Sequence, residues 1–105
     1  MVINYSVLIG QRATFDLEEA IEYYNSKKTD LGIEFLIEFH DLAEFVSKSP
    51  KINQKVYKFY RRFKLKRFPY LVYYYLEDRT SDKRMVIIRI NHSRKDQEKL
   101  KESFK

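Results

Sequence analysis

The pattern of apolar and polar side chains changes its period near residue 50. In most of the first half, apolar residues recur every third or fourth position, which is typical of helices with one buried face. In the second half they alternate with polar residues or form short aliphatic and aromatic runs, which is typical of strands. A chain of 105 residues has the length of one domain, so we expect residues 1–105 to form a single α+β domain.

The first half predicts one strand and two helices. Residues 2–9 alternate and predict a strand. Asp16, with Glu19 three positions later, is typical of a capping box and predicts a helix from Asp16 to about Ser26. A second helix is predicted to end before Pro50. Its apolar stripe has helical spacing and consists of Leu31, Phe35, Phe39, Leu42 and Val46.

The second half predicts three strands. They correspond to residues 56–67, Tyr70–Leu76 and Met85–Ile90, with a polar turn between the last two. The predicted order is therefore β-α-α-β-β-β. We expect the two-helix hairpin to pack on a small antiparallel sheet that also includes residues 2–9.

Charge is divided unevenly between the two halves. Residues 1–50 carry four basic and nine acidic side chains, whereas residues 51–105 carry seventeen basic and six acidic ones. The segment from Lys51 to Arg67 holds eight Lys and Arg and no acid. A surface with one strong sign of charge attracts the opposite polyion, and nucleic acid is the commonest polyanion.

The basic segment offers a candidate nucleic-acid surface. Residues two apart on a strand share a face, so Arg62, Lys64 and Lys66 are predicted to point the same way and to follow a phosphate backbone. Tyr60 on that face is a candidate for stacking on a base. The alternative is a solvated strand face whose lysines prevent edge-to-edge aggregation. The predicted nucleic-acid-binding residues are Tyr60, Arg62, Lys64, Lys66, Arg67 and Lys95.

The end of the last strand offers a candidate catalytic group. His92 beside fixed cations has the properties of a general acid or base for phosphodiester cleavage. Arg89 and Arg94 have those of groups that stabilise a pentacovalent phosphate. The alternative is a hydrogen-bonded structural histidine. His40 lies among acids on a predicted helix and is expected to be structural or solvated.

Other kinds of site are not expected. The chain has no Cys, and its two His lie far apart in sequence, so neither a thiolate nor a metal site is predicted. There is no Gly-rich phosphate loop, and no cofactor is expected. No apolar run reaches the ~20 residues of a membrane span, and the N-terminal stretch MVINYSVLIG lacks the features of a signal peptide. These features favour a cytoplasmic location.

Two blocks of the second half match a known pattern. Residues 61–74 read RRFKLKRFPYLVYY, and residues 91–96 read NHSRKD. The first block resembles the R-x(6)-F-P-Y-x-[IV]-x-Y stretch of the RelE/ParE superfamily of bacterial toxins. The second resembles the H-x-R-[RK]-[DP] ending of its ParE-like branch. The helical hairpin is also similar, and the resemblance covers residues 3–97.

The resemblance implies a toxin of a type II toxin–antitoxin system, a class linked to plasmid stabilisation, with a cognate antitoxin as partner. In the RelE branch, basic residues on the central strands position ribosome-bound mRNA and assist its cleavage. Their counterparts by strand position would be Arg61, Arg62, Lys64 and Arg89. The C-terminal Tyr that some RelE-like nucleases use cannot be placed here. The ParE branch is associated with inhibition of DNA gyrase, which needs no catalytic residue.

The leading hypothesis is translation-dependent mRNA cleavage by a metal-independent endoribonuclease. Its predicted catalytic residues are Arg61, Arg89, His92 and Arg94. The dense basic strand favours this hypothesis. The ParE-like ending favours the alternative, a non-catalytic inhibitor of DNA gyrase. A third hypothesis is a member that only binds its antitoxin.

Overall fold

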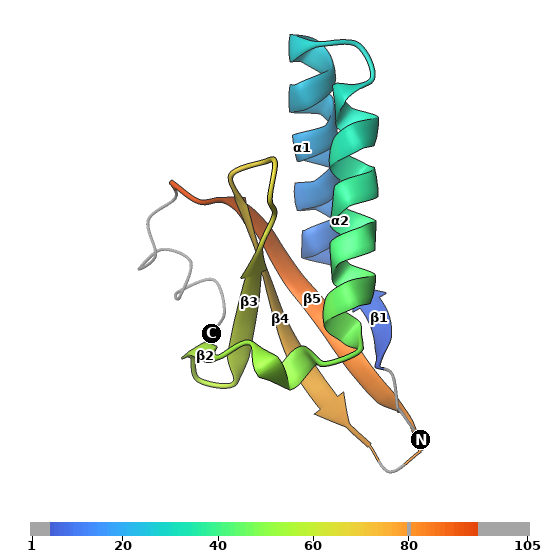
Figure 1. Cartoon of the computed structure of the whole chain (residues 1–105), viewed down its shortest axis with the longest axis vertical. Coiled ribbons are helices and arrows are strands. Elements are labelled where there is room, and N and C mark those ends of the chain that lie inside the picture. The colour runs from blue at the N-terminus through green and yellow to red at the C-terminus, as the bar shows by residue number, and fades with distance from the viewer. Residues whose placement is uncertain (1–4, 80, 95–105) are drawn as a thin grey trace.

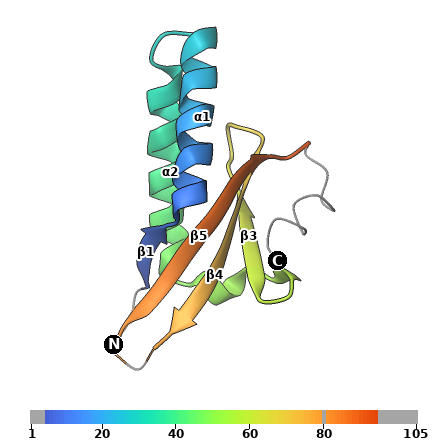
Figure 2. The same ribbon diagram turned by 180° about the vertical axis from the view of Figure 1, so that it is seen from behind.

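The computed structural model describes residues 5–79 and 81–94 and shows a helical hairpin packed on one face of a five-stranded sheet (Figures 1 and 2). The elements in chain order are β1 (Ser6–Ile9), α1 (Gln11–Lys27), α2 (Leu31–Ser47), a 3-10 turn (Pro50–Ile52), β2 (Lys55–Tyr57), β3 (Tyr60–Lys64), β4 (Tyr70–Asp78) and β5 (Lys83–His92). The predicted α+β class and the order β-α-α-β-β-β are confirmed, with the short β2 as an addition. None of the described helices is long and apolar enough to cross a membrane.

The sheet is mixed and not antiparallel throughout. Its strand order is β1-β5-β4-β3-β2, and β1 pairs in parallel with β5, from Ser6 opposite Arg84 to Ile9 opposite Ile87. The expectation of a fully antiparallel sheet was wrong for this pair. Parallel pairing requires a long crossover connection, and the helical hairpin between β1 and the remaining strands supplies one.

Residues 56–67 form a hairpin and the turn that follows it, where a single strand was predicted. The chain reverses at Lys58, whose φ of 52° lies in the left-handed region, and Tyr57 then pairs with Tyr60 across β2 and β3. The alternation could not reveal this reversal, because the segment contains neither Gly nor Pro, the residues that most often mark a tight turn.

Helix α1 begins five residues before the predicted capping box. Gly10 occupies its N-cap position, and the Thr14 hydroxyl donates to the Gly10 carbonyl oxygen at 3.1 Å. Asp16 lies inside the helix and is only 6% exposed. The prediction of Asp16 as N-cap was wrong, because its carboxylate accepts hydrogen bonds from β5 and not from its own first turn. The second helix was predicted correctly, since α2 ends at Ser47, before Pro50.

The core lies between the helical hairpin and the inner face of the sheet. Phe39 of α2 belongs to one buried cluster with strand residues from β4 and β5. Four aromatic rings extend this core, with centroids 4.8 to 6.0 Å apart; they belong to Tyr24, Phe35, Phe68 and Tyr70. The Phe-Pro-Tyr sequence at the start of β4 therefore serves packing, because Phe68 and Tyr70 both join the helices to the sheet.

A bulge in β5 sets the geometry of the end of the sheet. The register between β4 and β5 shifts between Tyr73 and Tyr74, which leaves Ile88 as an extra residue on β5. Beyond this bulge, the backbone N–H of Ile90 donates to an Asp16 carboxylate oxygen at 3.0 Å. The pairing of β5 with β1 ends at Ile87, and beyond that residue the Asp16 carboxylate caps the edge of β5.

Candidate functional site

The side chain of Arg89 is held by the carboxylate that caps the edge of β5. Its Nε donates to Asp16 Oδ2 at 3.0 Å, the same oxygen that accepts the N–H of Ile90. Arg89 is 8% exposed, and Nε of the exposed Arg12 lies 3.5 Å from the second carboxylate oxygen. A buried ion pair with these added hydrogen bonds ties α1 to β5 and leaves the guanidinium little surface to offer a substrate.

A small polar pocket lies beside this ion pair, between α1 and the end of β5. Its volume is about 220 Å³, and its lining consists of Asp16, Glu19, Ala20, Tyr23, Tyr70, Ile90, Asn91 and His92. Asn91 accepts a hydrogen bond from Arg89 Nη2 at 3.2 Å, while its own buried Nδ2 has no hydrogen-bond partner among the described residues. Among the described residues, two acids and no Lys or Arg line this pocket, and such a lining does not favour a phosphate ligand.

His92 lies at this pocket with one ring nitrogen engaged. Its Nδ1 accepts the backbone N–H of Arg94 at 3.1 Å, so a neutral imidazole would carry its proton on Nε2. The ring packs edge-on against Tyr70, with centroids 5.4 Å apart. Burial, followed by the nearby Tyr24, raises the pKa of Tyr70 to about 12. The Tyr70 phenol therefore stays protonated near neutral pH.

Arg61 belongs to the other end of the sheet. Its Nη1 donates to the carbonyl oxygens of Asn53 at 2.5 Å and of Lys51 at 3.3 Å, and so fixes the chain that follows the 3-10 turn. Arg61 lies opposite Tyr74 of β4, whereas His92 lies opposite Tyr70. Four residues of a strand correspond to roughly 13 Å, and two strand spacings add about 10 Å across the sheet. The structure does not bring Arg61 and His92 together.

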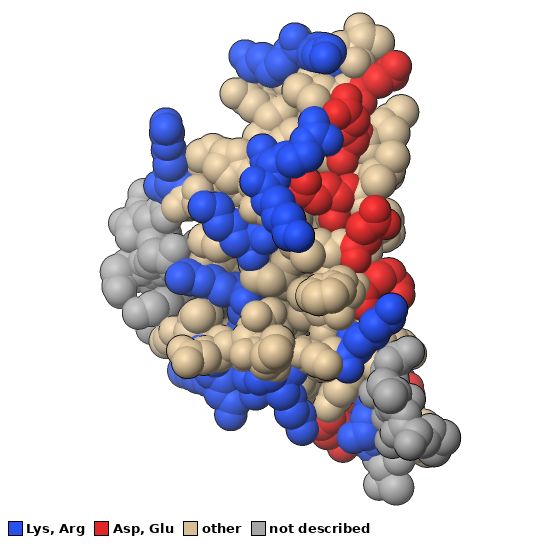
Figure 3. Space-filling view, viewed as in Figure 1, with Lys and Arg blue, Asp and Glu red and all other residues tan. Residues whose placement is uncertain are grey.

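Two of the residues predicted to form a basic surface lie on the outer face of the sheet. Arg62 and Lys64 project from the face opposite to the buried Phe63, as the alternation predicts, and Lys64 is exposed. The ring of Tyr60 is stacked on Tyr57, with centroids 6.5 Å apart and planes 6° apart. In Figure 3 a basic area over β3 adjoins a band of acidic side chains along α2.

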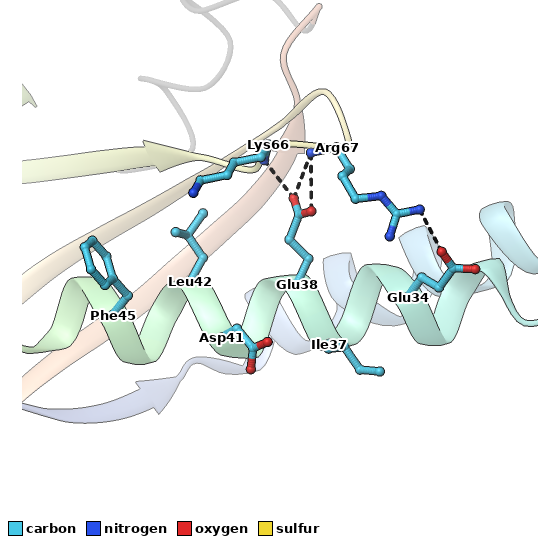
Figure 4. A pocket seen from close by; sticks show the side chains of 8 residues that line it. All are labelled: Glu34, Ile37, Glu38, Asp41, Leu42, Phe45, Lys66 and Arg67. Atoms are coloured by element: carbon cyan, nitrogen blue, oxygen red, sulfur yellow. Dashed lines mark hydrogen bonds and ion pairs between the residues drawn. The ribbon is translucent and has the colours of Figure 1, made fainter.

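Lys66 and Arg67 belong to the turn before β4, which docks on α2. Their backbone N–H groups donate to the Glu38 carboxylate, at 2.7 Å from Lys66 and 3.0 Å from Arg67 (Figure 4). Arg67 Nη2 also donates to Glu34 at 2.7 Å. Of the predicted nucleic-acid-binding residues, Lys66 is thus outside the strand, Arg67 is paired with an acid, and Lys95 lies outside the described residues.

The sequence did not reveal the structural use of three acids. Asp16 was predicted to cap a helix, and no pattern in the sequence assigned a structural role to Glu34 or Glu38. Glu34 and Glu38 are spaced i, i+4 and therefore lie one above the other on α2, which is the only available signal that they act together. Their partners are at least 28 positions away, beyond the reach of any local pattern.

Comparison with known proteins identifies the family. The sequence model of the ParE toxin of the type II toxin–antitoxin system parDE matches residues 7–97. The chain belongs to the ParE toxin family. The fold is similar to that of a solved chain described as the chromosomal ParDE toxin–antitoxin system from P. aeruginosa, with a TM-score of 0.72 and 14% identity. The match covers 84% of this chain and 95% of the other. A search of curated proteins gave no significant match.

Membership of the ParE family makes this chain the toxin of a type II toxin–antitoxin pair, with an antitoxin as its partner. The resemblance noted at the Phe-Pro-Tyr block and at residues 91–96 is confirmed by the match over residues 7–97. Within that block, Phe68 is a buried core residue and the partly buried Tyr70 packs against the core.

Proposed function

We propose that this ParE toxin acts in the cytoplasm by binding DNA gyrase and that it does not cut RNA. The observation that carries the proposal is the separate engagement of two of the three candidate catalytic arginines. Arg89 is buried in an ion pair with Asp16, and Arg61 donates to backbone carbonyls at the other end of the sheet.

The chemistry of RNA cleavage is the reason this observation matters. Phosphodiester cleavage needs a proton-transfer group and a charge-stabilising cation within hydrogen-bond reach of the same phosphate. Arg61 and His92 lie in cross-strand rows roughly 13 Å apart along β4, which is too far for one phosphate group. Inhibition of gyrase by binding needs only an exposed surface that fits the enzyme. The basic face of β3 and the acidic band on α2 are two such exposed surfaces (Figure 3).

Ribosome-bound mRNA is the second candidate target, and two observations favour it. Lys64 is exposed on the outer face of β3 beside Arg62, and Arg94 is exposed next to His92. Under this alternative, Arg62 and Lys64 would bind phosphate, Arg94 would stabilise the transition state and His92 would transfer a proton.

The antitoxin is inferred to contribute an acidic segment that becomes ordered on the toxin. The segment from Lys51 to Arg67 contains no acid, and β3 within it adjoins exposed aromatic surface at Phe59. An acidic, partly disordered chain is the natural complement of such a surface.

One experiment separates the two target classes. Toxin released from its co-expressed antitoxin and refolded is added to a supercoiling reaction with purified gyrase and to a translation reaction with a reporter mRNA. We expect inhibition of supercoiling and an intact mRNA. The variant His92→Ala should inhibit gyrase as the wild type does, and so should its matched control His40→Ala, which alters an exposed histidine on α2.

The opposite result would replace the proposal by the second candidate. That result is mRNA cleavage by the wild type without inhibition of gyrase, slowed roughly 10²–10⁴-fold in His92→Ala and unchanged in His40→Ala. In that case Lys64→Ala should also flatten the salt dependence of RNA binding, since each single-strand phosphate contact contributes a slope of about −0.7.

A further inference from the structure

Helix α2 combines acidic charge with exposed apolar side chains. Residues 31–47 contain four acids and no Lys or Arg. Three large apolar residues of the same helix are exposed, Ile33 to 52%, Ile37 to 55% and Phe45 to 71%. A helix packed only on its own core would expose polar residues there, so this face has the composition of a binding surface.

The exposed side of α2 also borders a groove. Its volume is about 540 Å³, and its lining consists of Glu34, Ile37, Glu38, Asp41, Leu42, Phe45, Lys66 and Arg67. Figure 4 shows Glu38 and Leu42 pointing toward the turn that carries Lys66, while Ile37 and Asp41 point away from that turn. From Glu34 to Phe45 the lining extends roughly 17 Å along the helix axis, at 1.5 Å per residue.

The acids of this face differ in what they do. Glu34 is paired with Arg67, and Glu38 accepts two backbone N–H groups, so both are used to hold the turn before β4. Among the described residues, Asp41 and Glu44 form no ion pair within 4.0 Å. Both acids are exposed on α2, where a cationic partner can reach them.

We propose that the α2 groove docks a basic amphipathic helix of a protein partner. The apolar stripe of that helix would cover Ile37, Leu42 and Phe45, and its Lys or Arg side chains would meet Asp41 and Glu44. An acidic segment of the kind inferred for the basic sheet face would meet like charge at Asp41 and Glu44, whereas Lys66 lies on the opposite wall of the groove, toward β3. The two surfaces lie on different elements, α2 and β3, so one toxin has separate sites for an acidic and a basic segment.

This inference goes beyond gyrase inhibition and is tested without gyrase. The probe is a synthetic 18-residue amphipathic peptide with a Leu stripe at helical spacing and Lys and Arg on its flanks. Its binding to the refolded toxin is measured by fluorescence anisotropy, beside a peptide with Glu in place of the basic residues and one with the same composition but a scrambled stripe. We expect the basic striped peptide to bind at least about tenfold more tightly than the scrambled one.

Variants assign the binding to the groove. Phe45→Ala and Asp41→Lys should each weaken binding of the basic striped peptide by about tenfold or more, because one removes an apolar contact and the other reverses a charge. Phe15→Ala is the matched control and should leave binding unchanged, since Phe15 is an exposed phenylalanine as well (55%, against 71% for Phe45) but lies on α1. Circular dichroism of each variant verifies the fold.

Three results would overturn the proposal. The first is a basic striped peptide that binds no better than the scrambled one, or equally well to Phe45→Ala. The second is an acidic peptide whose binding is lost in Phe45→Ala, which would assign the groove to an acidic segment. The third is a wild-type toxin that sediments as a dimer while Phe45→Ala sediments as a monomer, which would make this face a contact between two copies.

Discussion

Replacement of Asp16 by Ala should remove a large part of the stability of this fold. The carboxylate is 6% exposed and accepts two hydrogen bonds at 3.0 Å, from Arg89 Nε and from the backbone N–H of Ile90. Asp16→Ala leaves a guanidinium that is 8% exposed without its acid and leaves the N–H of Ile90 without its acceptor. Loss of one partner of a buried ion pair costs about 3–5 kcal/mol, against about 5–15 kcal/mol for the total stability of a domain.

The assay is urea unfolding of the refolded toxin at pH 7, followed by far-UV circular dichroism and linear extrapolation. We expect Asp16→Ala to lower the free energy of unfolding by about 3–5 kcal/mol. The control Glu18→Ala changes an exposed acid of the same helix and should stay within about 0.5 kcal/mol of the wild type. Asp16→Asn keeps an acceptor for Ile90 but loses the charge, so its effect should lie between those of Ala and the wild type.

A double variant tests the physical cause. When both members of a buried pair are replaced by apolar residues of similar size, the uncompensated charge disappears, and the cost is often small. Asp16→Leu combined with Arg89→Met should therefore be more stable than Asp16→Leu alone. The reasoning is refuted if Asp16→Ala costs less than about 1 kcal/mol, or if the second replacement makes the first one worse.

Three further predictions follow from the packing and the pKa shifts. Gly32→Ala should lower the free energy of unfolding by about 1–3 kcal/mol, because an added Cβ would lie 2.5 Å from a carbonyl oxygen of α1. Gly10→Ala should cost less, because its Cβ would lie 3.2 Å from a carbonyl oxygen of β5. Equal effects of the two substitutions would contradict the steric argument. Arg61→Ala should lower the free energy of unfolding by about 1.5–3 kcal/mol, because its hydrogen bonds to two carbonyl oxygens are lost. Lys64→Ala should change that free energy by less than about 0.5 kcal/mol. Similar urea midpoints for the two variants would show that Arg61 is not structural. The pKa of Tyr70 is raised to about 12 from an ordinary value near 10. The protonated phenol therefore contributes to the free energy of unfolding in full below pH 10, and this contribution is lost as the pH rises toward 12. The urea midpoint of Tyr70→Phe should fall less steeply over that range than the midpoint of the wild type.

Sequence periodicity predicted those elements whose buried face has a single simple repeat. The i, i+4 stripe of α2 and the aliphatic and aromatic runs of β4 and β5 were identified from sequence and are present in the structure. The break between β2 and β3 was missed, because Lys58 adopts the left-handed region without a Gly at that position. The parallel pairing of β1 was missed because strand direction depends on the path of the whole chain and not on the pattern of one segment.

The candidate site was less predictable than the fold, for a reason that individual residues make clear. Alternation placed Arg62 and Lys64 on the outer face correctly. It could not show that Arg61 is hydrogen bonded to carbonyl oxygens, or that Arg89 is paired with an acid 73 positions earlier in the chain. Such partners are chosen by tertiary packing, which brings together residues with no relation in sequence.

Charge segregation along the chain therefore overstates the positive surface that a target meets. The segment from Lys51 to Arg67 has eight basic residues, but the structure uses some of them internally. Arg61 fixes the chain after the 3-10 turn, and the guanidinium of Arg67 is paired with Glu34. The same pairing, with the Glu38 contacts, removes two of the four α2 acids from the other surface, which concentrates its remaining negative charge at Asp41 and Glu44. Opposite charges are thus paired where α2 meets the β3–β4 turn. A basic face over β3 and the two acids Asp41 and Glu44 of α2 remain on either side of this contact, each suited to a segment of the opposite sign.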